Sequence, residues 1–522
     1  MAFVLESNGL LTPNQSGFRK HRSTEEQIVF VREQAVKAIR TGQYAVGVFI
    51  DMKKAFDTAW HSAIVVELQN MGFGGKFLRF VYNFLRNRTI KVRVNSTISG
   101  EYKIENGVPQ GSCLSPLLFL ILINSLPGKI IFSNPLLYAD DFTLLIIGTC
   151  LKMLQKKVQT DLNGFEDWCE DHGLSASEEK STVIIFTHRR NYSNIELFIN
   201  KKKIKIENTV RYLGVTFDKN LNFNKHIECV ENSCNKNLGL FKRLCGTSWG
   251  TGKTQLAILY KSLVLSKILY ASTVLSGLSK TNLLTLKQVQ YSFLKIITGA
   301  VDKTKTDFLE VDTGIQPIDI ALKYRMYSFI SRSLAFPNPV TKDILTETWH
   351  SHYKKTKENT ILSIADPFIN TAEVREISHK ATQTSTIVQL SQPYLYPDLT
   401  AEIKKNAFID MAKKLTLNEW QLRWDSLPNS VYKNIYPLVI RNTVPPACNN
   451  RKINRLRYGK TILRNPYQIV GIGKNCPSCD VPLNTAHLLL TCNLQPITIT
   501  LKNYCNSHKI PHNLQDILTN EE

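Results

Sequence analysis

The sequence predicts an α+β region followed by a mainly helical one, and two observations lead to this expectation. Between residues 23 and 187, apolar residues at helical spacing alternate with short β-prone runs. From Phe223 to Ser331 the chain is rich in Leu, Lys and Tyr at helical spacing, with few strand signals. The expected division is 1–222 as an α+β part, 223–331 as a helical domain, 332–450 as a helical connection or linker, and 451–522 as a basic tail.

The first elements follow from local periodicity. From Ser23 to Ile39 the apolar residues recur every three or four positions, which predicts a helix. Gln43 to Phe49 is β-rich, which predicts a strand that ends at Ile50-Asp51.

The remaining elements of the first part follow in the same way. They are a helix over 63–85, a β segment over 89–94, a Gly-Pro loop at 107–112, a helix over 116–126, a hairpin over 136–147, a helix over 151–171 and a strand over 181–187. The hairpin carries Asp140-Asp141 at its tip, so two acids are expected at the end of a β-ribbon.

The size and charge of the chain limit its function. At 522 residues it exceeds the size of one hydrophobic core, which favours two to four domains. Its net charge of +22 calls for a polyanionic partner, of which nucleic acid is the commonest. The alternative is a basic protein without such a partner.

Targeting signals are absent from the sequence as given. The start, Met1-Ala-Phe-Val-Leu-Glu, lacks the features of a signal peptide, and apolar runs such as 117–123 fall short of the roughly 18 to 20 residues of a membrane span. The eleven cysteines are scattered, as in reduced intracellular proteins. We expect a soluble protein of the cytoplasm or nucleus, with no membrane partner; the oligomeric state stays open.

Three carboxylates are candidates for catalysis. Asp51 ends one predicted strand and Asp140-Asp141 lie between two others, so the three can converge at the ends of adjacent strands. Two-metal nucleotidyl transfer needs such an arrangement, because carboxylates are the hard oxygen ligands that Mg²⁺ prefers. Phosphoryl transfer then depends on position and charge neutralisation. An Asp-Asp pair alone would more often be an ordinary turn.

The context of these acids resembles the reverse transcriptase family. Tyr138-Ala139-Asp140-Asp141 is preceded by the box Phe49–Asp57, which contains Asp51 and Ala55-Phe56-Asp57, and by the loop Gly107–Ser112. All three occur in the family's order. The resemblance implies a right-hand polymerase fold with partial fingers and palm, a helical thumb and RNA-directed DNA polymerase activity.

Further segments resemble the non-LTR, jockey-like branch of this family. They are Asn14-Gln15-Ser16-Gly17-Phe18-Arg19 with Arg22-Ser23-Thr24, Gly173-Leu174 with Lys180-Ser181, and Tyr212-Leu213-Gly214-Val215. The resemblance covers about residues 7 to 220, and more weakly extends to Pro317. It implies an RNA template, a DNA primer or target and deoxynucleotides as partners.

The resemblance also implies roles for single residues. Asp51, Asp140 and Asp141 would bind two Mg²⁺ ions. Nucleotide contacts would come from Phe56, Gln110, Gly111, Lys180 and Arg19, and nucleic-acid contacts from Lys20, Arg22, Tyr212, Leu213, Gly214, Lys242 and Arg243. Without the family, Phe56 would be read as a core residue, the glycine loop as a turn and the cations as a solvated face.

Two other motifs bear on function. Gly250-Thr251-Gly252-Lys253-Thr254 is similar to a phosphate loop, but its required first glycine would fall at Thr247, so an NTPase site is rejected. Cys476, Cys479, His487 and Cys492 have the spacing of a closed tetrahedral zinc site and resemble the CCHC segment that follows the thumb in non-LTR elements. The basic run 451–457 just before them suits nucleic acid.

The family's endonuclease domain and the segment before the fingers motif are not in this sequence, and no RNase H-type start is seen between 331 and 450. The resemblance thus leaves two hypotheses: a polymerase lacking its endonuclease, or a catalytically inactive nucleic-acid-binding relic. A group II intron maturase is a third possibility, against which the zinc spacing argues.

Overall fold

The computed structural model describes residues 1–189, 195–245, 250–341 apart from 276, 301, 303, 337 and 339, then 397–428, 433 and 436–441. These residues form two compact units. The first contains Met1–His226 and the chain from Arg332 onward to the end of the described segment. The second contains Ile227–Ser331 and the later described residues, including helix α18 (Pro397–Asp425).

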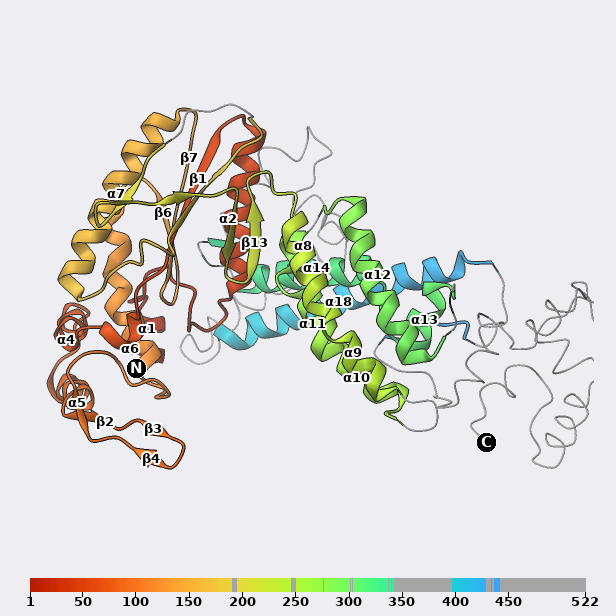
Figure 1. The fold of residues 1–522 in the computed structure, drawn as a ribbon, viewed down its shortest axis with the longest axis horizontal. Coiled ribbons are helices and arrows are strands. Elements are labelled where there is room, and N and C mark those ends of the chain that lie inside the picture. The colour runs from red at the N-terminus through yellow and green to blue at the C-terminus, as the bar shows by residue number, and fades with distance from the viewer. Residues whose placement is uncertain are drawn as a thin grey trace, which may run out of the picture. The chain divides into compact units, whose positions relative to one another are not determined.

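A five-stranded sheet forms the centre of the first unit (Figure 1). Its strand order is β11 (Lys205–Ile206), β8 (Thr182–Phe186), β1 (Tyr44–Ile50), β7 (Asp141–Gly148) and β6 (Asn134–Tyr138). Strand β1 is antiparallel to both β7 and β8, and all seven of its residues are buried. A strand that is covered on both faces needs a continuous apolar run, which β1 has.

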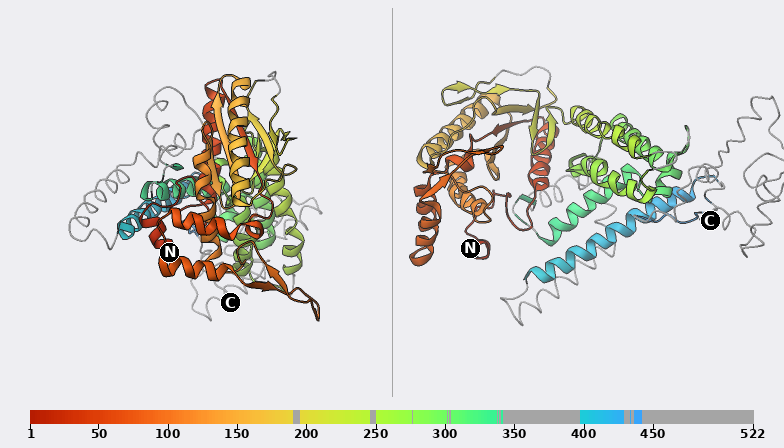
Figure 2. Two further views of the ribbon diagram at one scale, coloured as in Figure 1. Left: turned by 90° about the vertical axis from the view of Figure 1, so that its left-hand side faces the viewer. Right: turned by 60° about the horizontal axis from the view of Figure 1, so that its bottom comes forward.

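Long helices cover the sheet. Helix α2 (Thr24–Arg40) and helix α7 (Leu151–His172) lie on opposite sides of the strands (Figures 1 and 2). Phe142 of β7 stacks on Phe165 of α7, with ring centroids 5.2 Å apart. The predictions of a helix near 23–39, a strand at 43–50, a hairpin at 136–147, a helix at 151–171 and a strand at 181–187 are thus confirmed.

The predicted single helix over 63–85 is wrong. The structure has two helices, α4 (His61–Asn70) and α5 (Gly75–Leu85), and the chain between them turns at Gly72, whose φ is 85°. This left-handed conformation is open to glycine at little steric cost, so the glycines here end one helix and start another. Apolar periodicity continues across the break, and the sequence pattern therefore hid it.

Shorter elements complete the first unit. They are α1 (Ala2–Ser7), α3 (Ala55–Thr58), α6 (Ser115–Leu122), a 3₁₀ segment η1 (Ile123–Lys129), β9 (Phe198–Ile199) with β10 (Lys202–Lys203), and β12 (Thr209–Tyr212) with β13 (Val215–Asp218). The predicted helix at 116–126 therefore ends earlier as an α-helix and continues as 3₁₀. Pro127 lies inside that 3₁₀ segment and cannot donate a backbone hydrogen bond.

A narrow β-ribbon follows α5 (Figure 1). It consists of β2 (Arg88–Ile90) paired with β5 (Tyr102–Ile104), and β3 (Arg93–Val94) paired with β4 (Thr97–Ile98). The ribbon is exposed, and its apolar side chains include Val94 at 65% and Tyr102 at 62% exposure. The predicted β segment at 89–94 is thus one side of a hairpin that lies outside the central sheet.

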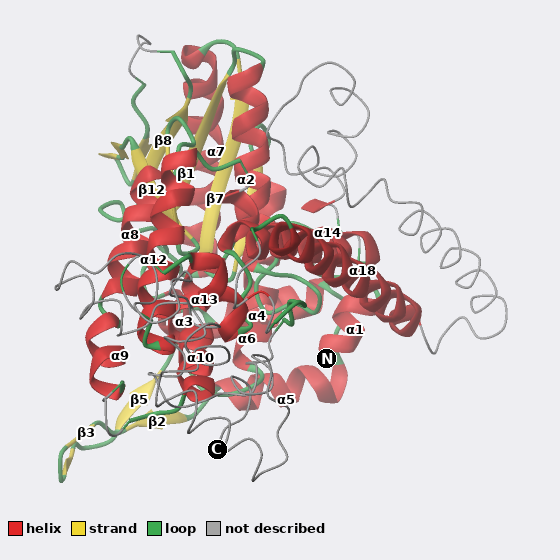
Figure 3. Ribbon diagram, turned by 90° about the vertical axis from the view of Figure 1, so that its right-hand side faces the viewer, coloured by secondary structure: helices red, strands yellow, loops and turns green. Residues whose placement is uncertain are grey.

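Helices make up the described part of the second unit (Figure 3). They are α8 (Asn224–Asn235), which begins at the end of the first unit, α9 (Leu238–Leu244), α10 (Lys253–Tyr260), a π-helical turn η2 (Lys261–Leu265), α11 (Ser266–Leu269), η3 (Ser272–Leu275), α12 (Lys280–Thr298), α13 (Thr306–Thr313), α14 (Ile318–Ala335) and α18. Phe293 packs between Phe241 and Tyr260 in its core. Among the described residues, no helix combines the length and the apolar character needed to cross a membrane.

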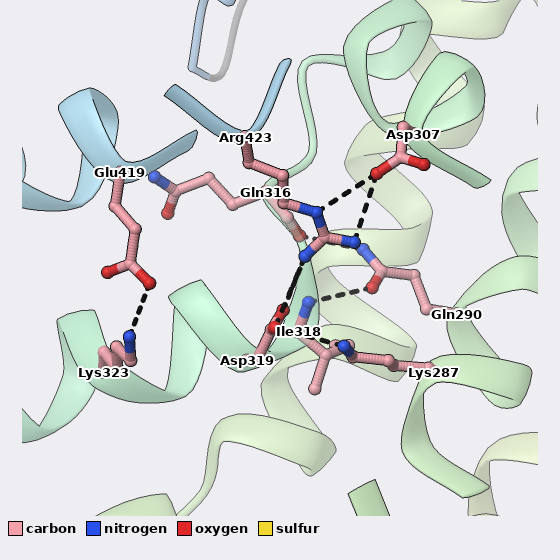
Figure 4. Close-up of polar contacts among 9 residues, drawn as sticks. All are labelled: Lys287, Gln290, Asp307, Gln316, Ile318, Asp319, Lys323, Glu419 and Arg423. Atoms are coloured by element: carbon pink, nitrogen blue, oxygen red, sulfur yellow. Dashed lines mark hydrogen bonds and ion pairs between the residues drawn. The ribbon is translucent and has the colours of Figure 1, made fainter. Parts of the chain in front are cut away.

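Helix α18 belongs to the core of the second unit. Trp420 and Trp424 are buried, and Trp424 meets the edge of Phe308 on α13. Arg423 forms ion pairs with Asp307, at 3.1 Å, and with Asp319, at 3.3 Å (Figure 4). Part of the region expected as a connection is therefore an ordered helix that packs on α13 and α14.

Candidate functional site

Strand register brings the predicted acids to one end of the sheet. In the antiparallel pair β1–β7, Ile50 lies opposite Phe142. Asp51 and Asp141 are the next residues, so they occupy neighbouring positions on adjacent strands. Asp140 precedes Asp141 in the tight turn from β6 to β7, in which Tyr138 pairs with Asp141. The three acids predicted from separate motifs are therefore neighbours.

The turn that carries Asp140 has unusual backbone geometry. Ala139 has a φ of 55°, in the left-handed region that alanine rarely adopts. A two-residue hairpin turn between twisted strands requires positive φ, and here alanine supplies it without the freedom of glycine. The local strain therefore has to be offset by contacts around the turn.

Burial and neighbouring charge raise the pKa of two of the acids. Partial desolvation, followed by the negative charges of Asp140 and Asp51, raises the pKa of Asp141 to about 6. The pKa of Asp140 is also raised, mainly by desolvation, with a contribution from Asp51. Desolvation and nearby negative charge both disfavour the ionised carboxylate.

Lys180 forms an ion pair with Asp51, with Nζ 3.6 Å from Oδ2. Its loop is tied to the end of β1, because Ser177 donates its N–H to the Asp51 carbonyl at 2.7 Å and Lys53 donates its N–H to the Ser175 carbonyl at 2.8 Å. The predicted nucleotide-contacting lysine is therefore beside the acids. Its side chain is 74% exposed, so it is accessible to a ligand.

The donor set fits a hard divalent cation. All three groups are carboxylates, and their mutual repulsion would be relieved by positive charge between them. Within the described residues, no three His, Cys, Asp or Glu side chains already lie close enough to enclose a metal ion.

The glycine loop packs on the segment that carries Phe56. Gly107 donates its N–H to the Ala59 carbonyl at 2.7 Å, and a Cβ on Gly107 would lie 2.5 Å from the Asp57 carbonyl oxygen. Gln110 donates from Nε2 to the Asp57 carboxylate at 2.9 Å. The predicted nucleotide-binding Gln110 and exposed Gly111 are therefore held next to helix α3.

Phe56 is half-buried. Its ring stacks on Phe119, with centroids 4.4 Å apart, and meets the edge of Phe18 at 6.3 Å. The packing interpretation of Phe56 thus accounts for one side of the ring. The residue nevertheless keeps part of its surface exposed.

The predicted cations near residue 20 have internal partners. Arg19 forms a bidentate ion pair with Glu6 and donates to the Thr12 carbonyl at 2.7 Å, and its side chain is 8% exposed. Arg22 donates to the Pro13 carbonyl, and burial lowers its pKa. Arg19 thus joins helix α1 to the following loop, whereas Lys20 is exposed.

The remaining predicted residues fall in three places. Tyr212 is buried and its ring centroid lies 5.0 Å from that of Phe49, while Leu213 and Gly214 form the positive-φ turn between β12 and β13. Lys242 and Arg243 are exposed in the last turn of α9, in the second unit. Cys476, Cys479, His487 and Cys492 lie outside the described residues.

Sequence reasoning assigned no role to several residues around the site. Gln15 hydrogen-bonds to the backbone of Ala139, and Asp57 accepts from Gln110. His61 and Arg88 both contact the Gly107 carbonyl. Gln15 and Asp57 lie inside the recognised motifs, which was the available signal, whereas His61 and Arg88 carried none.

Comparison with known proteins identifies a family for the first part of the chain. Residues 2–217 match the family model described as reverse transcriptase (RNA-dependent DNA polymerase). Over 339 residues the chain is 26% identical to the RNA-directed DNA polymerase from mobile element jockey of Drosophila melanogaster, which covers 64% of this chain and 37% of that protein. It is 28% identical over 240 residues to the probable RNA-directed DNA polymerase from transposon BS of the same species, which covers 44% of this chain and 26% of that protein.

The chain spans about a third of the length of the jockey polymerases that it matches, at 37% and 36%. Among solved structures, apo telomerase from Candida tropicalis truncated from its C-terminal domain is 16% identical and covers 42% of this chain and 41% of its own, with a TM-score of 0.31. That score is too low to carry an argument. Residues 2–217 therefore match the reverse transcriptase family, and the similarity to the jockey and BS polymerases supports a reverse transcriptase of the non-LTR retrotransposon type.

Proposed function

We propose that this chain is an RNA-directed DNA polymerase that extends a DNA 3′-hydroxyl with deoxynucleotides while it copies an RNA template. One observation carries the proposal: in a domain of the reverse transcriptase family, Asp51 and Asp141 occupy adjacent strand positions with Asp140 in the turn beside them. The raised pKa values of Asp140 and Asp141 support it, because burial and the negative charge of Asp51 both disfavour their ionised forms, which a bound cation would stabilise.

Asp51, Asp140 and Asp141 would bind two Mg²⁺ ions. When bound, the ions would neutralise charge on the attacking 3′-oxygen and on the leaving pyrophosphate. The chain's own residues position the reactants. Lys180, exposed and beside Asp51, would contact the phosphates of the incoming nucleotide.

Selection of the sugar is proposed for Phe56. Its ring is fixed by stacking on Phe119, so it cannot readily move aside. A bulky ring in this position would exclude a ribose 2′-hydroxyl by collision. Gln110, fixed by Asp57, and the exposed backbone of Gly111 would contact the nucleotide and template on the other side.

The exposed ribbon β2–β5 is a further candidate contact for nucleic acid. It presents Lys91, Arg93 and Lys103 together with exposed Ile90 and Tyr102. Cations beside exposed apolar and aromatic side chains suit a phosphate backbone with bases that can stack. Within the helical unit, the exposed Lys242 and Arg243 are separate candidates for contact with nucleic acid.

A primer-extension assay tests the proposed activity. A DNA primer on an RNA template is incubated with Mg²⁺ and deoxynucleotides, using the unmodified chain, Asp140→Ala and Asp51→Asn. Asp167→Asn is the matched control, because Asp167 is an exposed acid on α7, away from the motif residues.

Extension by the unmodified chain and by Asp167→Asn, with loss in the other two, is the expected result. Absence of extension in all four would refute the polymerase and favour the nucleic-acid-binding relic. Equal extension in all four would mean that these acids are not the catalytic ones.

A further inference from the structure

The turn that carries Asp140 is held by hydrogen bonds to residues 14–16, which are far away in the sequence. Ser16 donates its N–H to the Leu137 carbonyl at 2.9 Å, and Leu137 donates its N–H to the Asn14 carbonyl at 3.0 Å. Gln15 and Leu137 thereby form a parallel bridge. The segment 14–17 thus runs along strand β6, toward the turn.

The side chain of Gln15 binds both backbone polar groups of Ala139. Its Oε1 accepts the Ala139 N–H at 3.0 Å, and its Nε2 lies 3.4 Å from the Ala139 carbonyl oxygen. The same Oε1 accepts the Gly17 N–H at 2.7 Å. Gln15 is only 1% exposed, so water cannot replace these bonds.

Gly17 closes the contact. A Cβ at this position would lie 2.4 Å from the Ala139 nitrogen, which is closer than real Cβ atoms come. Only glycine allows the segment to approach the turn so tightly. The amide of Gln15 and the missing side chain of Gly17 therefore act on the same peptide unit.

Ala139 needs this support, because its φ of 55° is strained for a residue with a Cβ. The direction of the peptide between Ala139 and Asp140 depends on that dihedral angle. A relaxation of Ala139 would turn the backbone of Asp140 and change the separation of its carboxylate from Asp51 and Asp141.

We infer that Gln15 is a positioning residue: its amide clamps Ala139 in the left-handed conformation and so sets the direction of the Asp140 and Asp141 carboxylates. The catalytic part of this inference rests on the proposed polymerase function. The structural part does not. A purely structural glutamine would satisfy buried polar groups and affect stability, with no particular effect on the acids.

Gln27 provides the matched control. It is also fully buried, and its Nε2 donates to the Ser16 hydroxyl at 2.8 Å and lies 3.4 Å from the Leu137 carbonyl oxygen. It thus supports the same segment through Asn14, Ser16 and Leu137, whereas Gln15 binds Ala139 itself. Gln15→Met and Gln27→Met each remove one buried amide from the same region.

The test compares these variants by hydrogen exchange of the peptide around residues 137–142, by thermal melting and by steady-state primer extension. Gln15→Met is expected to speed exchange of the Ala139 amide and to lower kcat by about 100-fold with the KM for deoxynucleotide within about twofold, since small misplacements of reacting groups cost that much. Gln27→Met is expected to match its melting temperature but to retain most of kcat and the slow Ala139 exchange.

The inference is overturned if Ala139 exchange is unchanged in Gln15→Met, or if both variants lose kcat equally. If the unmodified chain shows no extension, the proposed function fails, and the exchange comparison alone still decides whether the clamp exists. Gln15→Glu serves if Gln15→Met does not fold. It keeps the acceptor for both N–H groups, so it should keep Ala139 exchange slow, and fast exchange in this variant would contradict the inference.

Discussion

The buried ion pair between Lys253 and Asp312 allows a quantitative test of the helical unit. Lys253 Nζ lies 2.9 Å from Asp312 Oδ1, and the two side chains are 3% and 0% exposed. Lys253 is also the lysine of the segment that is similar to a phosphate loop. Because Lys253 is buried in its ion pair with Asp312, it is not accessible to a nucleotide.

The perturbation is Asp312→Ala. It leaves a buried ammonium without its counter-charge, and breaking a buried pair in this way costs about 3–5 kcal/mol of unfolding free energy. With a urea dependence of roughly 2 kcal/mol per molar, the unfolding midpoint of the helical unit should fall by about 2 M. Chemical denaturation followed by tryptophan fluorescence measures the change.

Two further variants complete the test. Lys253→Met with Asp312→Leu removes both charges, and the double variant should recover most of the lost stability, because an apolar pair can replace a buried ion pair at little cost. Asp410→Asn breaks an exposed pair with Lys413 on α18 of the same unit, in which the two side chains are 64% and 52% exposed, and should cost less than about 1 kcal/mol. A midpoint for Asp312→Ala within the error of Asp410→Asn would refute the reasoning.

Three other predictions follow from charges and ligands. Desolvation raises the pKa of Glu310 from 4.5 to about 8, so the folded state resists ionisation of this carboxyl and loses stability as pH rises from 4.5 to 8. The Glu310→Gln variant should therefore have a higher melting temperature than the unmodified chain at pH 8.5 and a similar one at pH 4.5. A difference in melting temperature that does not change with pH would contradict this. Changing Lys91, Arg93 and Lys103 of the ribbon together to Gln should weaken binding to an RNA–DNA duplex and reduce the slope of log affinity against log salt concentration by roughly 2 to 3 in magnitude. An unchanged slope would show that the ribbon does not contact the nucleic acid. Cys476→Ser should lower the bound zinc measured by elemental analysis of the purified chain from about one ion to less, and equal zinc in both proteins would argue against the CCHC site.

Local patterns predicted much of the first unit. Strand β1 and the β6–β7 hairpin were predictable because an apolar run and two β-prone halves around a turn reflect burial directly. The break between α4 and α5 was not, since apolar spacing continues through it and the turn at Gly72 depends on backbone geometry. Helix α18 was predicted as part of a helical connection with a packing face at 420–424, but the sequence did not show what it packs on, because its partners on α13 and α14 lie about 100 positions away.

Within the site, residue type indicated which side chains could contact a ligand, but the sequence did not show which of them are bound by partners inside the fold. Arg19 was expected to face a nucleotide because it is a cation inside a recognised motif. Its partner Glu6 lies 13 residues earlier, and the ion pair forms only because helix α1 returns to this loop. Gln110 lies in the loop that was predicted to contact the nucleotide, but its hydrogen bond to Asp57 joins residues 53 positions apart and could not be predicted from local sequence.

By itself, the sequence determined which residues are candidates for catalysis. Carboxylates that follow or interrupt β-prone runs can be recognised from the sequence, because residue type and the preceding apolar run are local properties of the chain. Only the tertiary structure decided how those acids are held. The Gln15 amide reaches Ala139 across 124 residues, and the closeness of Asp51 to Asp141 depends on the register of two strands, β1 and β7, that are far apart in the chain. Such contacts arise from the packing of the whole sheet, in which distance along the chain no longer measures distance in space.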